Sequence, residues 1–191
     1  MPQILSTRSL YEGWTSLRLV RVRLDSGEVV DREVEDHGDA VAVLPYDPVR
    51  RTLMLVRIVR TPALLRAGRA ALLECPAGLL DEADPAEAAR REAKEEVGLA
   101  LGDVEHVGRV WTSPGISAEQ MDLYLAPYSA ADRVDTGGGI ASEHEAIEVA
   151  EVGLDVVWAM VERGELDDMK TLTLVQALRL RHPELFGGDG D

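Results

Sequence analysis

Residues 78–99 read G-L-L-D-E-A-D-P-A-E-A-A-R-R-E-A-K-E-E-V-G-L. Asp84 followed by Pro85 is typical of a helix start, because an N-cap carboxylate accepts backbone N–H bonds and proline is tolerated at the first helical position. Gly98 is typical of a residue just beyond a helix end. The segment therefore predicts a helix over residues 85–97 that carries many acidic side chains.

Three glutamates crowd one side of this predicted helix. Glu92 and Glu96 are four residues apart and therefore share a face, and Glu95 lies next to them. Like charges at such spacings destabilise an isolated helix by about 0.2–0.5 kcal/mol per pair. Either flanking Arg and Lys side chains relieve this repulsion on a solvated surface, or a bound cation does.

The sequence before the helix favours the cation. A short apolar run at residues 71–75 predicts a strand, which passes through Pro76 and Gly78 into a loop that leads to the acidic helix. A unit of strand, loop and helix brings the carboxylates close to the loop. Hard cations such as Mg²⁺ commonly bind through a few carboxylates together with substrate phosphates. The arrangement therefore suits a diphosphate substrate.

The remainder of the chain predicts a mixture of strands and helices. Residues 15–23 and 28–34 flank a turn at residues 25–27 and predict an antiparallel β-hairpin at the N-terminus. Further strands are expected at residues 40–45, 52–59, 71–75, 104–111, 120–126 and 146–152. Two helices are expected near the C-terminus, at residues 154–163 and 171–180.

Composition limits the classes of protein to which the chain can belong. The 191 residues, 46% of them apolar, can fill the core of one compact domain. A formal net charge of −15 argues against nucleic acid as a partner. The single cysteine, Cys75, excludes an internal disulfide framework, and we expect it in the core. No window approaches the roughly 18 apolar residues of a membrane span, so we expect a soluble, cytoplasmic protein that does not bind a membrane.

Residues 78–99 resemble the Nudix box, whose pattern is G-x5-E-x7-R-E-U-x-E-E-x-G-U with U an aliphatic residue. The residues that match its second half are Arg91, Glu92, Glu95, Glu96, Gly98 and Leu99, with Ala93 at the aliphatic position between them. The first half departs from the pattern: it is one residue short, and its early Glu is replaced by Asp84 or displaced to Glu82.

This resemblance to the Nudix hydrolase superfamily implies an α/β fold in which a mixed β-sheet is sandwiched between helices. It places the hydrolase domain at residues 37–184, after an N-terminal antiparallel β-hairpin subdomain at 1–36 and before a tail at 185–191. In the ADP-ribose pyrophosphatase-like branch of this superfamily, the N-terminal strands usually pack across a homodimer. An isolated hairpin with an apolar face is consistent with that expectation, because two strands alone are barely stable in water.

Several stretches resemble the GDP-mannose pyrophosphatase branch of the ADP-ribose pyrophosphatase-like enzymes. They are A-G-L-L-D-x-x-x-P from Ala77, V-R-I-V-R with Arg57 and Arg60, S-P-G at 113–115 followed by Glu119, G-G-G at 137–139, and G-E-L-x-D-x-K-T ending at Thr171. The resemblance implies Mg²⁺-dependent hydrolysis of GDP-mannose or ADP-ribose to a nucleoside monophosphate and a sugar phosphate. The alternative is a Nudix-like sensor that binds a nucleotide sugar without cleaving it.

The resemblance also implies which residues bind the metal ion. This ion would be Mg²⁺, which Mn²⁺ can replace. Glu92, Glu96 and the backbone carbonyl of Ala77 would bind it, with Glu95 in the metal shell or its water network. Arg91 would hold the glutamates through its guanidinium fork, or else form an ordinary surface ion pair.

A mobile loop after the box is where this superfamily often supplies a general base and a further metal ligand. Glu143 is the predicted base and Glu145 the predicted ligand, with His144 between them in a supporting role. Glu119 is the rival base and is also a candidate for binding substrate.

The predicted substrate contacts are mostly cationic. Arg32, Arg57, Arg60 and Lys170 are the cations that the resemblance places near phosphates or the sugar, and Arg suits bidentate phosphate contact. A nucleobase needs a flat surface for stacking, for which Trp14 is the candidate. We expect Trp111 and Trp158 in the core instead.

Overall fold

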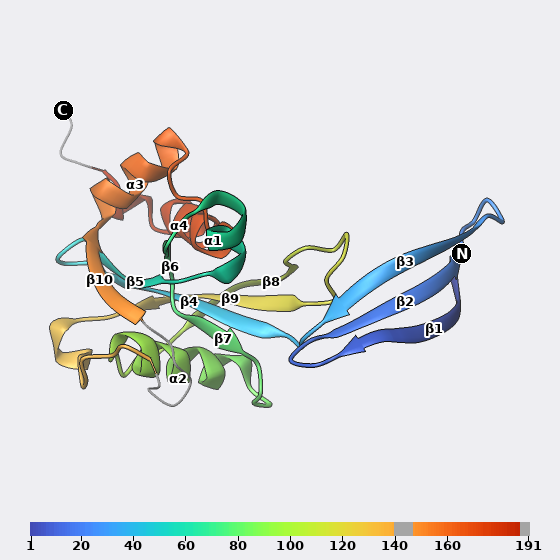
Figure 1. Ribbon diagram of the computed structural model, residues 1–191. Helices are drawn as coiled ribbons and strands as arrows, with labels where there is room; N and C mark the ends of the chain where they lie inside the picture. Colours follow the sequence, from blue (N-terminus) through green and yellow to red (C-terminus); the bar gives the residue numbers. More distant parts are fainter. Residues whose placement is uncertain (140–146, 188–191) are drawn as a thin grey trace. The chain divides into compact units, whose positions relative to one another are not determined.

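The computed structural model describes residues 1–139 and 147–187. The chain divides into two compact units (Figure 1). Unit 1 comprises Met1–Ala40 and Arg109–Met121, and unit 2 comprises Val41–Gly108 and Asp122–Asp191.

Unit 1 contains a three-stranded antiparallel sheet in the order β1-β2-β3. Its strands are β1 (Gln3–Glu12), β2 (Ser16–Arg23) and β3 (Val29–Asp36). The predicted hairpin is β2 and β3, joined by a turn in which Gly27 has φ +86°. The sequence did not predict β1, because every residue of this strand is exposed and no burial pattern marks it.

Unit 2 is built on a larger mixed sheet. Its described strands are β4 (Ala40–Asp47), β5 (Thr52–Ile58), β6 (Leu72–Glu74), β7 (Ala77–Leu79), β8 (Glu105–Trp111), β9 (Gln120–Pro127) and β10 (Ile147–Gly153). The strand order is β10-β5-β4-β9-β8, with β6 paired to β5 and β7 paired to β4. Residues 109–111 of β8 and 120–121 of β9 belong to unit 1. All of β4 is buried, as expected of a central strand whose two faces are both covered.

Helices cover both faces of this sheet. They are α1 (Thr61–Ala67), α2 (Pro85–Val97), α3 (Leu154–Arg163) and α4 (Met169–Arg181). Figure 1 shows α2 on one face and α1, α3 and α4 on the other, which confirms the predicted α/β fold with a sheet between helices. The sequence did not predict α1, a short helix with no buried residue. None of the helices in residues 1–139 and 147–187 is long and apolar enough to cross a bilayer.

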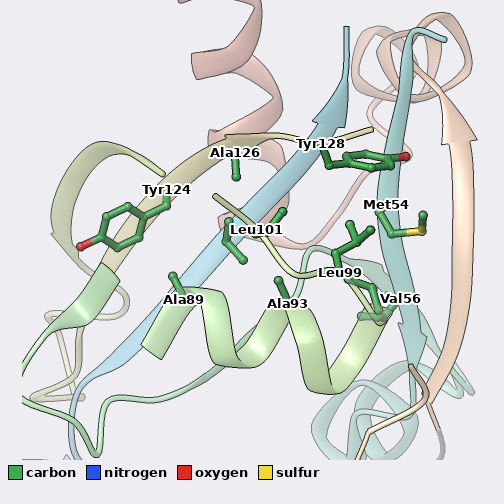
Figure 2. Packing of buried hydrophobic residues seen from close by; sticks show 11 residues of the cluster. Met54, Val56, Ala89, Ala93, Leu99, Leu101, Tyr124, Ala126 and Tyr128 are labelled. Atoms are coloured by element: carbon green, nitrogen blue, oxygen red, sulfur yellow. The ribbon is translucent and has the colours of Figure 1, made fainter. Parts of the chain in front are cut away.

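Helix α2 packs closely on the sheet through small side chains. Ala88, Ala89, Ala93 and Val97 are fully buried on its inner face. Figure 2 shows Ala89 and Ala93 in the cluster that includes Met54 and Tyr124 from the sheet. Because these side chains are small, the backbone of α2 lies close to the strands. Neighbouring residues on the same face of α2 are therefore buried as well.

The ends of α2 lie where local sequence predicts them. The Asp84 side chain accepts a hydrogen bond of 2.9 Å from the backbone N–H of Ala86, and Pro85 occupies the first turn. Gly98 ends the helix at φ +72°, in the left-handed conformation that glycine adopts without strain.

Cys75 is buried, as predicted, and burial raises the pKa of its thiol to about 12. The prediction for Trp111 was wrong: this side chain is 54% exposed, because β8 is the last strand of the sheet order and most of its residues face solvent. Trp158 is half-buried rather than a core residue. The Arg179 guanidinium carbon lies 3.8 Å from the centroid of the Trp158 ring, a cation–π contact at the surface of α3.

Candidate active site

Helix α2 carries two of its glutamates on its buried face. Glu92 is 8% exposed and Glu96 is 4% exposed, because both lie on the same stripe as the small residues that contact the sheet. Burying a carboxylate is costly unless it is paired or hydrogen-bonded. Two buried carboxylates one helical turn apart therefore require specific partners.

The residues that begin β7 meet both carboxylates. The backbone N–H of Ala77 donates a 3.2 Å hydrogen bond to Glu96 Oε2. A Cβ atom built on Gly78 would lie 2.0 Å from Glu92 Oε1, so only glycine allows the backbone to approach this carboxylate as it does. Ala77 and Gly78 thus present bare backbone to Glu92 and Glu96, as predicted from the loop before the acidic helix.

Arg91 is the hub of the acidic side chains around this helix. It lies 2.7 Å from Glu82 Oε1, 2.8 Å from Glu92 Oε1, 3.0 Å from Glu95 Oε2 and 2.8 Å from Asp81 Oδ1. Burial lowers the pKa of Arg91, but this ring of carboxylates leaves it raised overall, so the guanidinium stays charged. One positive charge faces four carboxylates, which leaves a local excess of negative charge.

The structure distinguishes between Asp84 and Glu82, the two candidates for the early acidic position of the box. Asp84 serves as the helix cap, whereas Glu82 reaches the guanidinium that also holds Glu92. Of the two candidates for the early acidic position, Glu82 is therefore the one that joins the glutamate network.

The donor set fits a hard divalent cation. Within residues 1–139 and 147–187, no group of three or more His, Cys, Asp and Glu side chains is arranged to hold a metal ion. Glu92 and Glu96 instead offer two carboxylates on one face of α2. This suits Mg²⁺, which usually keeps several waters and binds through one or two carboxylates plus substrate phosphates.

A cavity of ≈ 770 Å³ lies along α2 beside this network. Its lining includes Glu82, Arg91, Lys94, Glu95, Asp135 and Gly139. The volume lies within the range of about 300–1,000 Å³ that is usual for small-molecule sites. The cavity therefore lies beside Glu82 and Glu95, two of the carboxylates held by Arg91, whereas Glu92 and Glu96 are not among its lining residues.

The glycine-rich segment 137–139 is anchored to the end of the same helix. The backbone N–H groups of Gly138 and Gly139 donate hydrogen bonds of 2.9 Å and 3.1 Å to the carbonyls of Glu96 and Glu95. A Cβ on Gly137 would lie 2.5 Å from the Glu96 carbonyl oxygen. The glycines thus allow the chain to cap carbonyls that the helix end leaves without partners. Glu143, His144 and Glu145 lie outside the described residues.

Arg60 and Lys170, both predicted to contact substrate, converge on one buried carboxylate. Arg60 donates to both oxygens of Glu74, at 3.0 Å and 2.9 Å, and the Lys170 ammonium also donates to Glu74. Glu74 is only 1% exposed. The structure therefore brings these two cations together around a protein carboxylate, while Arg57 is exposed on β5.

The other predicted substrate residues belong to unit 1. Trp14 is 77% exposed and stacks on His37, with the ring centroids 5.1 Å apart. Arg32 is exposed and donates to the backbone carbonyl of Asp31. Glu119 accepts a 2.6 Å hydrogen bond from the Thr112 hydroxyl, and its other oxygen lies 3.4 Å from His37 Nε2.

His37 is a candidate functional residue that sequence reasoning did not find. Its Nδ1 lies 2.6 Å from Glu35 Oε1, and Glu35 also accepts hydrogen bonds from Thr15 and Ser117. Burial lowers the pKa of His37, but Glu35 and Glu119 outweigh it and leave the pKa raised. The sequence gives no signal for this group, because Glu119 and Ser117 are distant from His37 along the chain.

The described structure is thus a layered α/β fold in which one helix, α2, brings two buried glutamates to the backbone of Ala77 and Gly78. The NUDIX domain pattern matches residues 36–179, and the chain belongs to this family.

Relatives of known name are similar over nearly the whole chain. A GDP-mannose pyrophosphatase of Cronobacter sakazakii is 36% identical over 184 residues, which cover 94% of this chain and 95% of the relative. A GDP-mannose pyrophosphatase of Klebsiella pneumoniae subsp. pneumoniae is 36% identical over 193 residues, covering 98% and 96%. The crystal structure of an ADP compounds hydrolase has the same fold, with a TM-score of 0.77 at 20% identity and coverage of 96% and 95%.

Proposed function

We propose that this protein hydrolyses the pyrophosphate bond of a nucleoside diphosphate sugar and releases a nucleoside monophosphate and a sugar phosphate. The observation that carries the proposal is the convergence of the buried carboxylates Glu92 and Glu96 on the bare backbone of Ala77 and Gly78. The two relatives named GDP-mannose pyrophosphatase make GDP-mannose the first candidate substrate, and ADP-ribose is the second.

In this proposal Glu92, Glu96 and the Ala77 carbonyl bind Mg²⁺, or Mn²⁺ in its place, with Glu145 as a further ligand. Glu95 belongs to the metal shell or its water network. When bound, the cation neutralises the pyrophosphate and lowers the pKa of a coordinated water. Arg91 orients the carboxylates, since one guanidinium contacts Glu92 and Glu95 at once.

The residues that handle the proton are Glu143, the proposed general base, and Glu119, its rival. A carboxylate takes a proton from water as the water oxygen attacks one phosphorus atom and the bridging P–O bond breaks. The bridging oxygen leaves on the other phosphate. Of these two glutamates, the structure describes only Glu119, in unit 1.

Nucleotide recognition is assigned to Arg32, Arg57 and Trp14. The exposed Trp14 ring offers a flat surface for a base, and the two exposed arginines offer forked donors for phosphate. Lys94, which lines the cavity along α2, adds a cation beside the carboxylate network.

We also propose that the protein works as a homodimer. Strand β1 is at the edge of the three-stranded sheet, and its exposed residues include Ile4, Leu5 and Tyr11. An exposed edge strand with apolar side chains is a template for pairing with another chain. Light scattering should then give a mass about twice the 20.8 kDa of one chain. The cytoplasmic location stays a prediction.

The test is a comparison of substrates with purified protein and Mg²⁺: GDP-mannose, ADP-ribose and a nucleoside triphosphate. Identification of the products by ³¹P NMR should show GMP with mannose 1-phosphate, or AMP with ribose 5-phosphate, and chelation of the metal should stop the reaction. Binding of a sugar nucleotide without turnover would instead support a non-catalytic sensor.

A further inference from the structure

Four consecutive residues, from the last residue of β6 to the first of β7 (residues 74–77), are each fixed by a different partner. The Glu74 side chain is held by Arg60 and Lys170. The Cys75 N–H donates to Thr171 Oγ1 at 2.7 Å, and the Pro76 carbonyl accepts from the Val43 N–H at 3.0 Å. The Ala77 N–H donates to Glu96 at 3.2 Å. This connector therefore joins the start of α4 to the carboxylates of α2.

The start of α4 supplies two of these partners through its cap. The N-cap residue Asp168 accepts hydrogen bonds from the backbone N–H of Thr171 at 3.0 Å and from its hydroxyl at 2.6 Å. The other Asp168 oxygen accepts from Lys170 at 3.0 Å. The cap thus directs Lys170 to Glu74 and Thr171 to the neighbouring Cys75 N–H, which explains why an Asp, a Lys and a Thr occur together in this segment.

The charges of this network are balanced, and those of Glu74 and Lys170 are shielded from solvent. Glu74 is 1% exposed and the Lys170 side chain is 11% exposed. Burial raises the pKa of Glu74, but Arg60 and Lys170 leave it below its ordinary value; burial lowers the pKa of Lys170, but neighbouring acidic groups leave it raised. Both groups are therefore charged, and two cations face the carboxylates of Glu74 and Asp168. A buried ion pair is an expensive way to gain stability, so a role in fixing geometry is the better account.

We propose that Lys170 and Glu74 are positioning residues of the metal site: Lys170 holds Glu74 so that the 74–77 connector presents Ala77 to Glu96, and Lys170 does not contact a substrate phosphate. In the part of the chain that the structure describes, Lys170 donates to two protein carboxylates, Glu74 and Asp168. Turning the ammonium toward a phosphate would leave the buried Glu74 with Arg60 as its remaining cationic partner. The inference rests on the proposed function, since it assumes a metal ion at Glu92 and Glu96.

Metal binding without substrate separates this role from phosphate binding. We would titrate Mn²⁺ into the full chain and follow free Mn²⁺ by electron paramagnetic resonance. Lys170→Met should weaken Mn²⁺ binding by about tenfold or more, as is usual when a group that orients metal ligands is lost. Lys170→Arg should restore much of the affinity. Arg163→Met, which removes an exposed cation paired with Glu165 at the end of α3, is the matched control and should bind Mn²⁺ like the wild type.

Each alternative gives a different result. If Lys170 contacts phosphate, Lys170→Met will keep its Mn²⁺ affinity and raise KM for the sugar nucleotide, which would overturn the proposal. If Lys170→Met does not fold, Glu74→Gln takes its place: it is nearly isosteric, and weaker Mn²⁺ binding is again the expected result. A wild-type protein that binds no Mn²⁺ would refute the proposed function itself, whereas normal binding by the wild type and both variants would refute only the positioning role.

Discussion

Gly78 and Glu92 approach each other so closely that a Cβ atom on Gly78 would lie 2.0 Å from Glu92 Oε1 and 2.2 Å from Glu92 Cδ. The nearest atoms belong to the end of a flexible side chain rather than to backbone. An added methyl group would therefore push the carboxylate aside and leave the surrounding core in place. Gly78 is in this way a determinant of where Glu92 lies.

Gly78→Ala should thus separate activity from stability. We expect kcat to fall by about 10²-fold, because small displacements of catalytic groups cost that much, while the free energy of unfolding changes by less than about 1.5 kcal/mol. Steady-state kinetics and chemical denaturation measure the two effects. Gly102→Ala is the matched control, since a Cβ there meets nothing within 4 Å. Full activity in Gly78→Ala would show that the position of Glu92 does not matter for turnover.

Glu96→Gln tests the metal assignment directly. Removal of one ligand charge should lower kcat by about 10³-fold or more, the loss typical of a group that stabilises charge in the transition state, and the fold should remain intact. Glu165→Gln is the control, because Glu165 is exposed, pairs with Arg163 and does not line the cavity along α2. Circular dichroism would confirm the fold of both variants. Unchanged turnover in Glu96→Gln would contradict the metal site.

The parts of the structure that sequence predicted depend on local signals. The limits of α2 follow from Asp84, Pro85 and Gly98, and the buried strands follow from uninterrupted apolar runs such as β4. Strand β1 and helix α1 were missed because they bury no side chains, so burial left no pattern in their residues.

In the candidate site, too, residues related by local sequence were predictable, and residues brought together by packing were not. Glu92 and Glu96 were predictable because a helix places residues four apart on one face. The pairing of Glu74 with Lys170 was not, since the two are 96 positions apart and only the packing of α4 against β6 brings them together. For the same reason, a cation such as Lys170 can be recognised from sequence without its partner being known.

The glycine-rich segment should be sensitive to a methyl group for backbone reasons. Gly137 has φ +69°, and a Cβ there would lie 2.5 Å from the Glu96 carbonyl oxygen and 2.7 Å from the Val97 Cα. Unlike Gly78, it would meet backbone, which cannot move without disturbing the end of α2. We expect Gly137→Ala to destabilise the protein by about 1–3 kcal/mol. Thermal unfolding would measure this, with Gly187→Ala as the control, because Gly187 has no neighbour within 4 Å of a built Cβ. A melting temperature equal to that of the wild type would contradict the close contact.

His37 should make the stability of unit 1 depend on pH. Its ring lies between Glu35 and Glu119 and stacks on Trp14, and the carboxylates raise its pKa above the ordinary value of 6.5. A raised pKa in the folded state means that folding favours the protonated ring. The resulting stabilisation is present in full below pH 6.5 and is lost as the pH rises through the folded-state pKa.

His37→Gln should therefore cost more stability at low pH than at high pH. We expect a loss of about 1.5–3 kcal/mol near pH 6, the usual contribution of a hydrogen bond to a charged group, and a smaller loss near pH 9. Burial raises the pKa of Glu35, but its hydrogen bonds leave this pKa below the ordinary value of 4.5. The stabilisation from Glu35 is therefore lost only as the pH falls through that lowered pKa. The window between pH 6 and pH 9 consequently isolates His37. Trp111 and Trp158 are replaced by Phe in both proteins, so that Trp14 reports unfolding. Urea denaturation followed by Trp14 fluorescence then gives the difference in the free energy of unfolding at each pH. An equal loss at pH 6 and pH 9 would mean that His37 contributes through packing on Trp14 and not through its charge.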